Sequence, residues 1–532
     1  LKEGLVQNKI PLVREGLQEA LRELAVGVDL MPILPLIIQA SDLPDIPIKK
    51  TVYTLMTEIA RYDPEMSILL TNTLLKDCTN DNPILRAVAL RAMCGIDVPT
   101  IREELPGLIT KGLADTNNYV RRMAVLAVVS AYPLVGETLK GKGVENRLYD
   151  LLRDRDPTIV SNALYALSEI TREGEGVNFT PQLIHHLVNS LTKFPEWKAS
   201  DVLQAIAKYK PGSDKERFDI MNVVDQLLAT DSPTLVVSAT NVLMSLTQDR
   251  KDLQQKVVVR VIPHFVTLIS SSPYEAQFCL IKHLTVLAGR YASKFESHVS
   301  YFLPLFDDPQ YLAIAKFELL KNVSTEKVAP QVIDSAQRYL LMERSGTVSA
   351  GIELLKELAI RIPSVAPLVL QRFRLFVQLK REILVNEMVC AMGDMLRRIP
   401  SIQKDLLSLF NDISVSSIGI DAAASYVFIA GEYLSNKVYQ MEELIGEFWD
   451  KKGAVGVFHD SVVLFKMNVI VALAKSLFKT PLEAKPVPEM ALVSGLSDPH
   501  PSVKQRAQIV CNLLKKDLDA ANEVLLFPKE VE

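Results

Sequence analysis

A short polar turn followed by an apolar helical segment recurs along this 532-residue chain at nearly constant spacing. The turns start at Asp45, Asp81, Thr116, Arg155, Lys193, Asp231, Ser271 and Asp307. Successive starts are 36, 35, 39, 38, 38, 40 and 36 residues apart, and a late copy spans Asp498–Lys504. Most copies contain proline, which suits the first turn of a helix because its missing N–H costs no hydrogen bond there.

The stretch Asn72–Met93 shows one such unit. Leu74–Leu75 close one amphipathic segment, Asn80–Pro83 interrupt it, and Ile84 and Val88 begin the next apolar face. A period in the high thirties with two helices per period indicates repeats of the HEAT or armadillo type. One helical pair cannot bury its own apolar face, so neighbouring pairs must stack. The sequence therefore predicts an all-α, right-handed α-solenoid of helical hairpins.

The composition narrows the class of protein. The net charge is −4, whereas a nucleic-acid binder usually shows a basic excess, so no nucleic-acid partner is predicted. The five cysteines form no CxxC pair, which predicts reduced thiols and no zinc site. No apolar run is expected to reach the length of a membrane span, since the longest, Leu30–Ile38, contains two prolines.

An arginine follows the turn at the same place in two consecutive repeats. Tyr119–Leu126 repeats the pattern of Ile84–Leu90, and Arg121 falls at the position of Arg86. We expect these arginines to bond carbonyls or carboxylates of an adjacent repeat and so join the stack. A role in binding a partner is the alternative.

The repeats are clearest over residues 29–320, and the turn signature decays beyond about Gln337. The helix spacing nevertheless continues through residues 337–515, with pairs expected around Gly346, Arg381, Gly419 and Asp460. We therefore predict one trunk domain over residues 1–532.

Two packing details are also predicted. A terminal amphipathic helix over Pro11–Leu24 is expected to bury a stripe formed by Leu12, Leu17, Leu21 and Leu24. Trp197, at a repeat turn, is expected to be a packing anchor.

The sequence contains no recognisable catalytic motif: it has no Gly-rich phosphate loop, no GxSxG and no HExxH. His185 and His186 are adjacent on a helix and cannot both face one metal ion, so one is expected to pack and the other to face water. The neighbours His459 and Asp460 are read as a chance pairing. We predict a protein that is not an enzyme and needs no metal or cofactor.

The densest basic group consists of Arg372, Arg374, Lys380 and Arg381. The favoured interpretation is a solvated helix face. The alternative is a patch that contacts anionic lipid headgroups or an acidic partner.

Several segments carry a family resemblance. Asn72–Cys78 followed by Asn82–Arg91 resembles the first repeats of β-adaptins, which are large subunits of the heterotetrameric adaptor complexes of vesicle coats. The likeness continues through Tyr119–Arg122 and Asp156–Val160, within a well-matched span from about Pro47 to Val237. Among β-adaptins, the chain looks nearest to the β subunit of the fourth adaptor complex, a likeness carried by Leu151–Pro157, His185–Leu187 and Phe218–Ile220.

The resemblance implies a non-enzymatic scaffold for intracellular protein transport and cargo sorting. Its implied partners are a second large adaptin, a medium (μ) subunit, a small (σ) subunit and an ARF-class small GTPase. It implies a cytoplasmic location with peripheral association at trans-Golgi or endosomal membranes. The resemblance implies that the GTPase docks at Lys76, Asp77, Asn82, Arg86 and Arg91. For Asp77, Asn82 and Arg86 we favour instead a role in holding repeats together.

The chain departs from the family pattern in two ways. It ends at Glu532 without the hinge and ear that follow a β-adaptin trunk, and Leu525–Lys529 lacks the acidic end of a clathrin box. Clathrin binding is therefore not predicted. The alternative function is that of another HEAT-repeat protein, either a phosphatase scaffold or a nuclear transport receptor.

Overall fold

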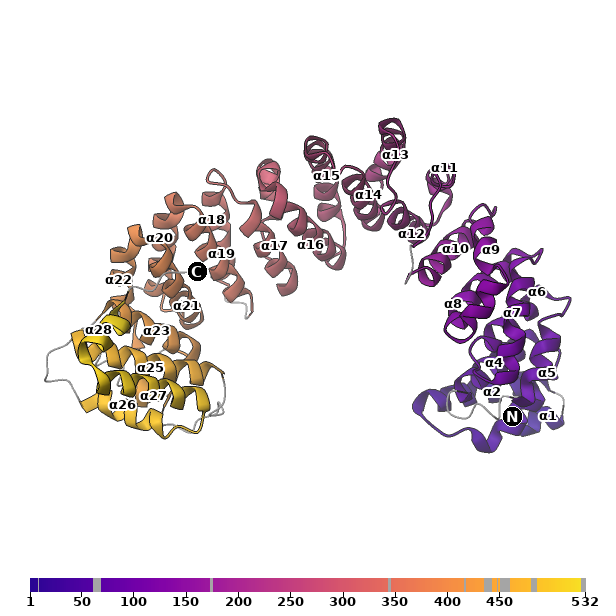
Figure 1. The fold of residues 1–532 in the computed structure, drawn as a ribbon, viewed down its shortest axis with the longest axis horizontal. Coiled ribbons are helices and arrows are strands. Elements are labelled where there is room, and N and C mark those ends of the chain that lie inside the picture. The colour runs from indigo at the N-terminus through magenta and orange to yellow at the C-terminus, as the bar shows by residue number, and fades with distance from the viewer. Residues whose placement is uncertain are drawn as a thin grey trace. The chain divides into compact units, whose positions relative to one another are not determined.

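The computed structural model describes residues 1–7, 9–60, 68–172, 176–342, 346–415, 418–434, 443–446, 448–449, 460–479 and 486–527. Over these residues all regular secondary structure is helical, as the sequence predicts (Figure 1). Contacts between residues divide the chain into two compact units, Leu1–Val257 and Val258–Glu532. Helix α15 (Lys251–Ser271) crosses the division.

Unit 1 contains α1 (Lys2–Val6), α2 (Ile10–Val26), α3 (Leu34–Ala40), α4 (Ile46–Ile59), α5 (Ile68–Asp77), α6 (Pro83–Met93), α7 (Pro99–Leu113), α8 (Asn118–Gly141), α9 (Val144–Leu151), α10 (Pro157–Ile170), α11 (Pro181–Asn189), α12 (Glu196–Ile206), α13 (Asp214–Gln226) and α14 (Pro233–Leu246). Its short 3-10 helices are η1 (Met31–Ile33), η3 (Leu191–Lys193) and η4 (Leu227–Ala229).

Unit 2 contains α16 (Tyr274–Tyr291), α17 (Gln310–Val323), α18 (Ala329–Leu340), α19 (Thr347–Arg361), α20 (Ala366–Gln378), α21 (Glu382–Arg398), α22 (Gln403–Asn411), α23 (Ile420–Tyr433), α25 (Asp460–Lys479), α26 (Pro486–Leu496), α27 (Pro501–Lys516) and α28 (Leu518–Leu526). Its 3-10 helices are η5 (Ala292–Phe302), η6 (Pro363–Val365) and η7 (Pro400–Ile402).

Each predicted turn immediately precedes a helix, and the reason is local. The side chains of Asn82, Asn117 and Asp156 accept a hydrogen bond from the N–H two residues ahead, at the start of α6, α8 and α10. Such caps satisfy N–H groups that have no partner inside the helix. Asp45 and Ser232 cap α4 and α14 by accepting from the N–H three residues ahead. The turn signature therefore predicted the helix starts correctly.

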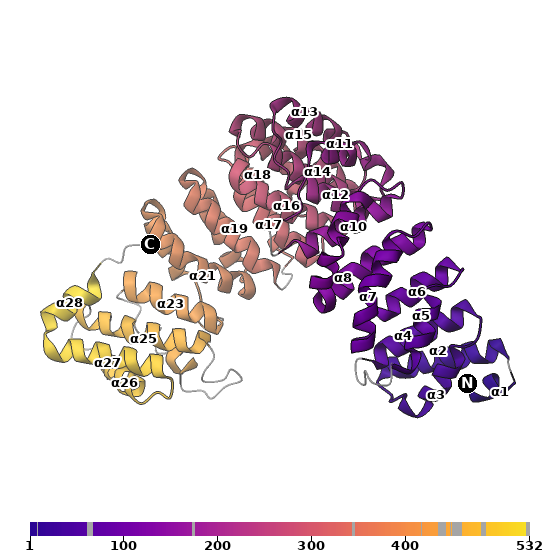
Figure 2. The same ribbon diagram turned by 45° about the vertical axis from the view of Figure 1, so that its right-hand side comes forward.

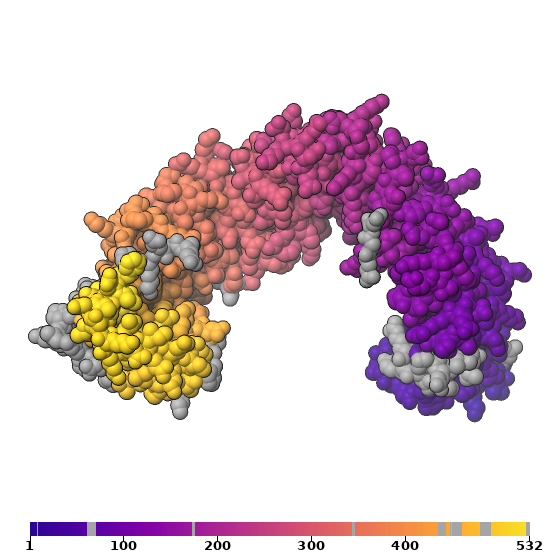
Figure 3. Space-filling model, in the orientation of Figure 1, coloured from indigo at the N-terminus to yellow at the C-terminus, as the bar shows by residue number. Residues whose placement is uncertain are grey.

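Within each unit the helices that follow these turns form a row, which we call row B. In unit 1 row B runs α4, α6, α8, α10, α12 and α14, each contacting the next. Helices α5, α7 and α9 form a second row, row A, behind it. Within unit 1 the chain colours in Figure 3 follow one another in sequence order, as expected for repeats that contact mainly their neighbours.

Unit 2 continues the same plan with row B helices α16, α17, α19, α21, α23, α25 and α27. Helices α18, α20 and α22 form its row A. Figures 1 and 2 both place α19, α21 and α23 side by side. The diverged repeats were predicted correctly here, because Gly346, Arg381 and Gly419 directly precede α19, α21 and α23.

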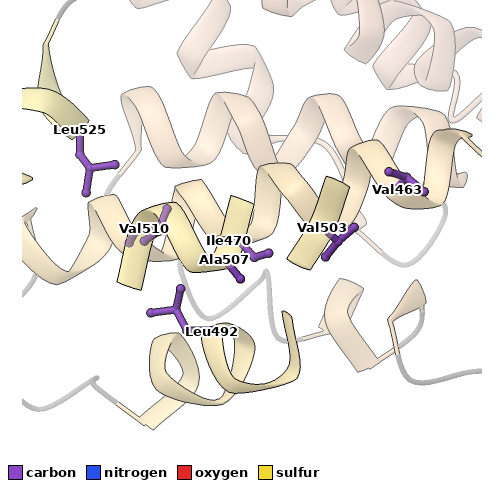
Figure 4. Close-up of a cluster of buried hydrophobic side chains, with 8 residues drawn as sticks. Val463, Ile470, Leu492, Val503, Ala507, Val510 and Leu525 are labelled. Atoms are coloured by element: carbon purple, nitrogen blue, oxygen red, sulfur yellow. The ribbon is translucent and has the colours of Figure 1, made fainter. Parts of the chain in front are cut away.

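The last helices of unit 2 share an apolar core (Figure 4). Its buried side chains come from α25, α26, α27 and α28: Val463, Ile470, Ala474, Leu492, Val503, Ala507, Val510 and Leu525. Row B thus ends against two further helices that cover its apolar face.

Two helices are long and apolar enough to cross a membrane by length and composition, so the expectation that no run approaches that length is wrong. Residues Asn118–Gly141 make up α8, which contains Pro133 and leaves helical geometry at Val135. Residues Asp460–Phe478 lie in α25, which carries two buried lysines in ion pairs. Both helices pack within row B, and core helices of repeat proteins meet the same criteria.

Of the two predicted packing details, one is partly wrong and the other wholly wrong. In the predicted leucine stripe of α2, Leu17 is buried and Leu24 half-buried, but Leu12 and Leu21 lie at the surface, and the helix buries Val13 and Ala20 in their place. Trp197 is 73% exposed at the start of α12 and is not a packing anchor.

Close helix approach makes one glycine in row B irreplaceable. A Cβ added to Gly431 of α23 would lie 2.5 Å from the Cβ and 2.8 Å from the Cα of Ala472 in α25. We expect Gly431→Ala to lower the free energy of unfolding by about 1–3 kcal/mol through overpacking. The matched control is Gly289→Ala in α16, where nothing lies within 4 Å of the added methyl group. It should raise stability by about 0.5–1 kcal/mol. Urea titration of both variants tests this, and equal effects would contradict it.

Candidate functional site

Arg86 joins its own repeat to the next. Its guanidinium donates from Nε and Nη2 to the two carboxylate oxygens of Asp115, at 2.9 Å each. Its Nη1 donates to the carbonyls of Asn80 and Asp81, at 2.8 and 3.0 Å. The bidentate pair is geometrically specific, since the planar guanidinium matches the carboxylate.

Arg121 repeats this arrangement one repeat later. It donates to Asp154 at 2.9 and 3.2 Å, and to the carbonyls of Asp115 and Thr116 at 2.9 Å. Asp115 therefore belongs to both links of a ladder that runs along row B. The interpretation that these arginines join adjacent repeats is confirmed.

Two other residues implied in GTPase docking also have structural contacts. Asp77 is 2% exposed and accepts hydrogen bonds from Lys49 Nζ and Tyr53 Oη, both at 2.5 Å. Asn82 caps α6. Together with Arg86, these side chains hold helices in place, in agreement with the favoured interpretation.

Lys76 and Arg91, the remaining two, are exposed. Arg91 lines an open groove across α4, α6 and α8, together with Lys50, Tyr119 and Met123. The sequence search missed the other members of this groove. Lys50, Tyr119 and Met123 lie on the same side of consecutive row B helices. The sequence reveals this shared position only when the repeats are aligned by their turns.

Two members of the basic group near α20 have carboxylate partners on neighbouring helices. Arg372 donates to Asp334 of α18 at 2.7 Å, and Arg374 lies 3.7 Å from Asp405 of α22. Lys380 and Arg381 are exposed at the turn between α20 and α21. Two of the four residues thus bridge neighbouring row A helices.

Within the described residues, no group of three or more His, Cys, Asp or Glu side chains is arranged to hold a metal ion. His185 and His186 are both exposed, so the expectation that one of them packs is wrong. His185 Nδ1 lies 3.2 Å from the side-chain nitrogen of Asn189. His459 lies outside the described residues.

The stability that these arginine–carboxylate pairs contribute depends on pH. A further cross-repeat pair lies beside the ladder, where Arg122 Nε donates to Asp156 Oδ2 at 2.8 Å. Burial works against the charged form of Asp115 and Asp156, but hydrogen bonds from Arg86 and Arg122 lower the pKa of each carboxyl below its ordinary value. The unfolded chain, with carboxyl pKa values of about 3.9, therefore binds more protons near pH 4. The stabilisation is complete above about pH 5 and is lost as the pH falls through 4.

We accordingly expect the urea midpoint of the chain to fall between about pH 5 and pH 3. Asp115→Asn should flatten that dependence, because it removes one of the titrating groups. Asp150→Asn is the control, since that carboxylate is exposed and only 3.6 Å from Arg147 within the same helix. An unchanged slope in Asp115→Asn would contradict the derivation.

The fold defines a class: an α-solenoid protein built of stacked helical-hairpin repeats. Within that class the assignment is specific. The chain belongs to the adaptin N-terminal region family, whose family model matches residues 15–518.

Three relatives illustrate the similarity. Beta-adaptin-like protein A of Arabidopsis thaliana is 27% identical, covering 97% of this chain and 62% of that protein. AP-4 complex subunit beta-1 of Mus musculus is 28% identical, covering 97% and 69%. AP-1 complex subunit beta-1 of Homo sapiens is 26% identical, covering 99% and 56%. The chain thus spans 56–69% of the length of these relatives, and the resemblance to β-adaptins is confirmed.

Two known structures share the fold. A chain in a homology model of the full-length AP-3 complex has a TM-score of 0.60 at 16% identity, covering 96% of this chain and 92% of that one. A chain from a structure of Kap95p with RanGDP has a TM-score of 0.56 at 12% identity, covering 93% and 72%. At these identities the likeness shows an α-solenoid and nothing closer.

Proposed function

We propose that this chain is the trunk of a β-type large subunit in a heterotetrameric adaptor complex, where it scaffolds a vesicle coat. The observation that carries the proposal is the adaptin family match over residues 15–518. The relatives named AP-4 and AP-1 β subunits support the β type.

The geometry suits a scaffold. Two bidentate arginine–carboxylate pairs join the repeats that start with α6, α8 and α10, so a partner meets a surface that is already ordered there. Pre-ordering reduces the entropy lost on association. We propose that the chain acts without catalysis, as part of a peripheral coat on the cytoplasmic side of trans-Golgi or endosomal membranes.

The proposed partners are a second large adaptin, a μ subunit and a σ subunit. An ARF-class GTPase is proposed to dock at Lys76 and Arg91, the two carried-over residues that are exposed and outside the structural pairs. The other three carried-over residues are unsuited to docking because their polar groups are occupied within the fold.

A nuclear transport receptor or phosphatase scaffold remains the alternative. The Kap95p likeness supports it at the level of fold alone, at 12% identity, whereas the adaptin family model matches residues 15–518 of this chain. The family match therefore favours the adaptor assignment.

Affinity isolation of the tagged chain from cells, with quantitative mass spectrometry of its stoichiometric partners, tests the proposal. We expect one further large adaptin, one μ and one σ subunit at equal abundance. Arg91→Glu should leave these three in place and reduce recovery of an ARF-class GTPase at least fivefold. Recovery of phosphatase catalytic subunits or transport cargo in their place would overturn the adaptor assignment.

A further inference from the structure

The turn before α17 presents two apolar side chains to solvent. Leu305 is 59% exposed and Phe306 is 73% exposed, and Asp307 beside them is also at the surface. Leu305 and Phe306 stand four and three positions before the turn proline, Pro309. At the offset of Leu305 three of the other proline turns also carry a large apolar residue: Leu43, Leu191 and Ile269. At the offset of Phe306 none of them does: the residues there are Pro44, Asn80, Asp154, Thr192, Thr230 and Ser270. Repeat packing therefore does not require a large apolar residue at the position of Phe306.

A buried ion pair between Asp308 and Lys316 fixes the conformation of the turn before α17. Asp308 is 1% exposed, and its Oδ2 accepts from the Leu305 N–H at 2.7 Å and from Lys316 Nζ at 2.6 Å. Lys316 is itself 2% exposed. The backbone of Leu305 is therefore fixed with its side chain outward. An apolar pair that is fixed in place loses little conformational entropy when a partner covers it.

Aromatic side chains flank the pair on two helices. Tyr274 of α16 is 37% exposed and donates from Oη to Asp307 Oδ2 at 3.3 Å. Tyr311 of α17 is 41% exposed and meets Phe278 edge-on at 5.6 Å between ring centroids. We call Tyr274, Leu305, Phe306, Asp307 and Tyr311 the 305 patch. Tyrosine and phenylalanine are enriched in protein interfaces, where they supply much of the contact area.

The charge at the 305 patch is negative. Asp307 is exposed within it, and Glu275, also exposed, is close enough to Tyr311 to contribute with burial to raising the pKa of that tyrosine. The Asp307 charge is the main cause of a raised pKa at Tyr274. The nearby Lys282 does not neutralise them, since it forms an ion pair with Glu318. An acidic rim opposes binding to an anionic lipid surface.

We propose that the 305 patch is a docking surface for a protein whose apolar pocket, rimmed by arginine or lysine, receives Leu305 and Phe306. The acidic rim supplies the charge complementarity that selects such a partner and suppresses others. This inference does not depend on the adaptor assignment, because it uses only the contacts, exposure and charge of unit 2.

Site-specific photo-crosslinking of the full chain in cells tests the inference. A benzophenone side chain is placed at position 306, or at position 286 as the matched control, since Val286 is also 73% exposed but lies near the other end of α16. We expect position 306 to give one dominant protein adduct through a peptide containing both apolar and basic residues. Asp307→Lys with Glu275→Lys should reduce its yield at least tenfold. Neither charge reversal should change the melting temperature, because both side chains are at the surface.

Three outcomes would overturn the proposal. They are adducts to lipid, equal adduct patterns from positions 306 and 286, and a dominant adduct whose yield is unaffected by the two charge reversals. Failure of this test leaves subunit recovery in the affinity isolation unchanged, so it is distinguishable from failure of the proposed function.

Discussion

Asp77→Ala is expected to destabilise the first repeats of unit 1 by about 3–5 kcal/mol, because it leaves a buried ammonium group without its counter-ion. Asp77 is 2% exposed, and its carboxylate receives both Lys49 and Tyr53 from α4. Removing one partner of such a pair costs more than the pair itself contributes, since the remaining charge stays buried. The effect should exceed that of removing Asn82, an N-cap whose loss costs about 1 kcal/mol.

Hydrogen exchange of peptides from α4, α5 and α6, together with the urea midpoint, measures this loss. Lys76→Ala is the matched control, since it changes the neighbouring exposed residue and should alter stability by no more than about 0.5 kcal/mol. A partner-docking role for Asp77 predicts the opposite pattern: unchanged exchange in Asp77→Ala together with lost GTPase recovery. Lys49→Met with Asp77→Leu should regain most of the stability lost in Asp77→Ala, because a buried pair is replaced by apolar volume.

Sequence reasoning succeeds where the controlling interaction is local. Asn82 and Asp156 can be recognised as caps because each bonds an N–H two residues away. The positions of Arg86 and Arg121 after consecutive turns predicted their cross-repeat bonds, since a fixed period places equivalent residues at equivalent distances from the next turn. The period also survives where turn residues have diverged, as at Gly419 before α23.

It fails where the outcome depends on which neighbour a helix meets. Helix α2 carries two overlapping apolar stripes, and packing against its neighbours buries Val13 and Ala20 while Leu12 and Leu21 stay at the surface. Trp197 lies at the second position of α12, where a side chain can point either along the stack or away from it. Spacing alone does not fix that rotation.

Predictions from charges that are close together in sequence fail for a related reason. Arg372 looks like part of a basic cluster in sequence, but its carboxylate partner, Asp334, is on the preceding row A helix. The sequence does not predict the 305 patch either, because Leu305 and Phe306 resemble ordinary core residues until their exposure is known. Aligning the repeats by their turn proline marks Phe306 as an exception, since no other proline turn has an aromatic residue at that offset.

Lys316→Met is expected to lower stability by about 3–5 kcal/mol and to release the turn that carries the 305 patch. The substitution keeps an apolar side chain of similar length but leaves the Asp308 carboxylate buried without its cation. That carboxyl must then take up a proton or draw water into the turn. In either case the hydrogen bond from the Leu305 N–H weakens, and faster amide exchange over residues 303–309 should report the change.

Two variants separate this pair from ordinary surface electrostatics. Lys282→Met breaks an exposed pair with Glu318 and should cost no more than about 1 kcal/mol. Lys316→Met with Asp308→Asn removes both buried charges and should recover at least half of the loss, since an uncharged amide tolerates burial better than a lone carboxylate. Because Leu305 and the benzophenone side chain at position 306 are present in all of these chains, crosslinking should fall in Lys316→Met and recover in the double variant. If crosslinking is lost while amide exchange over residues 303–309 is unchanged, the ion pair supports the fold of unit 2 without presenting the 305 patch.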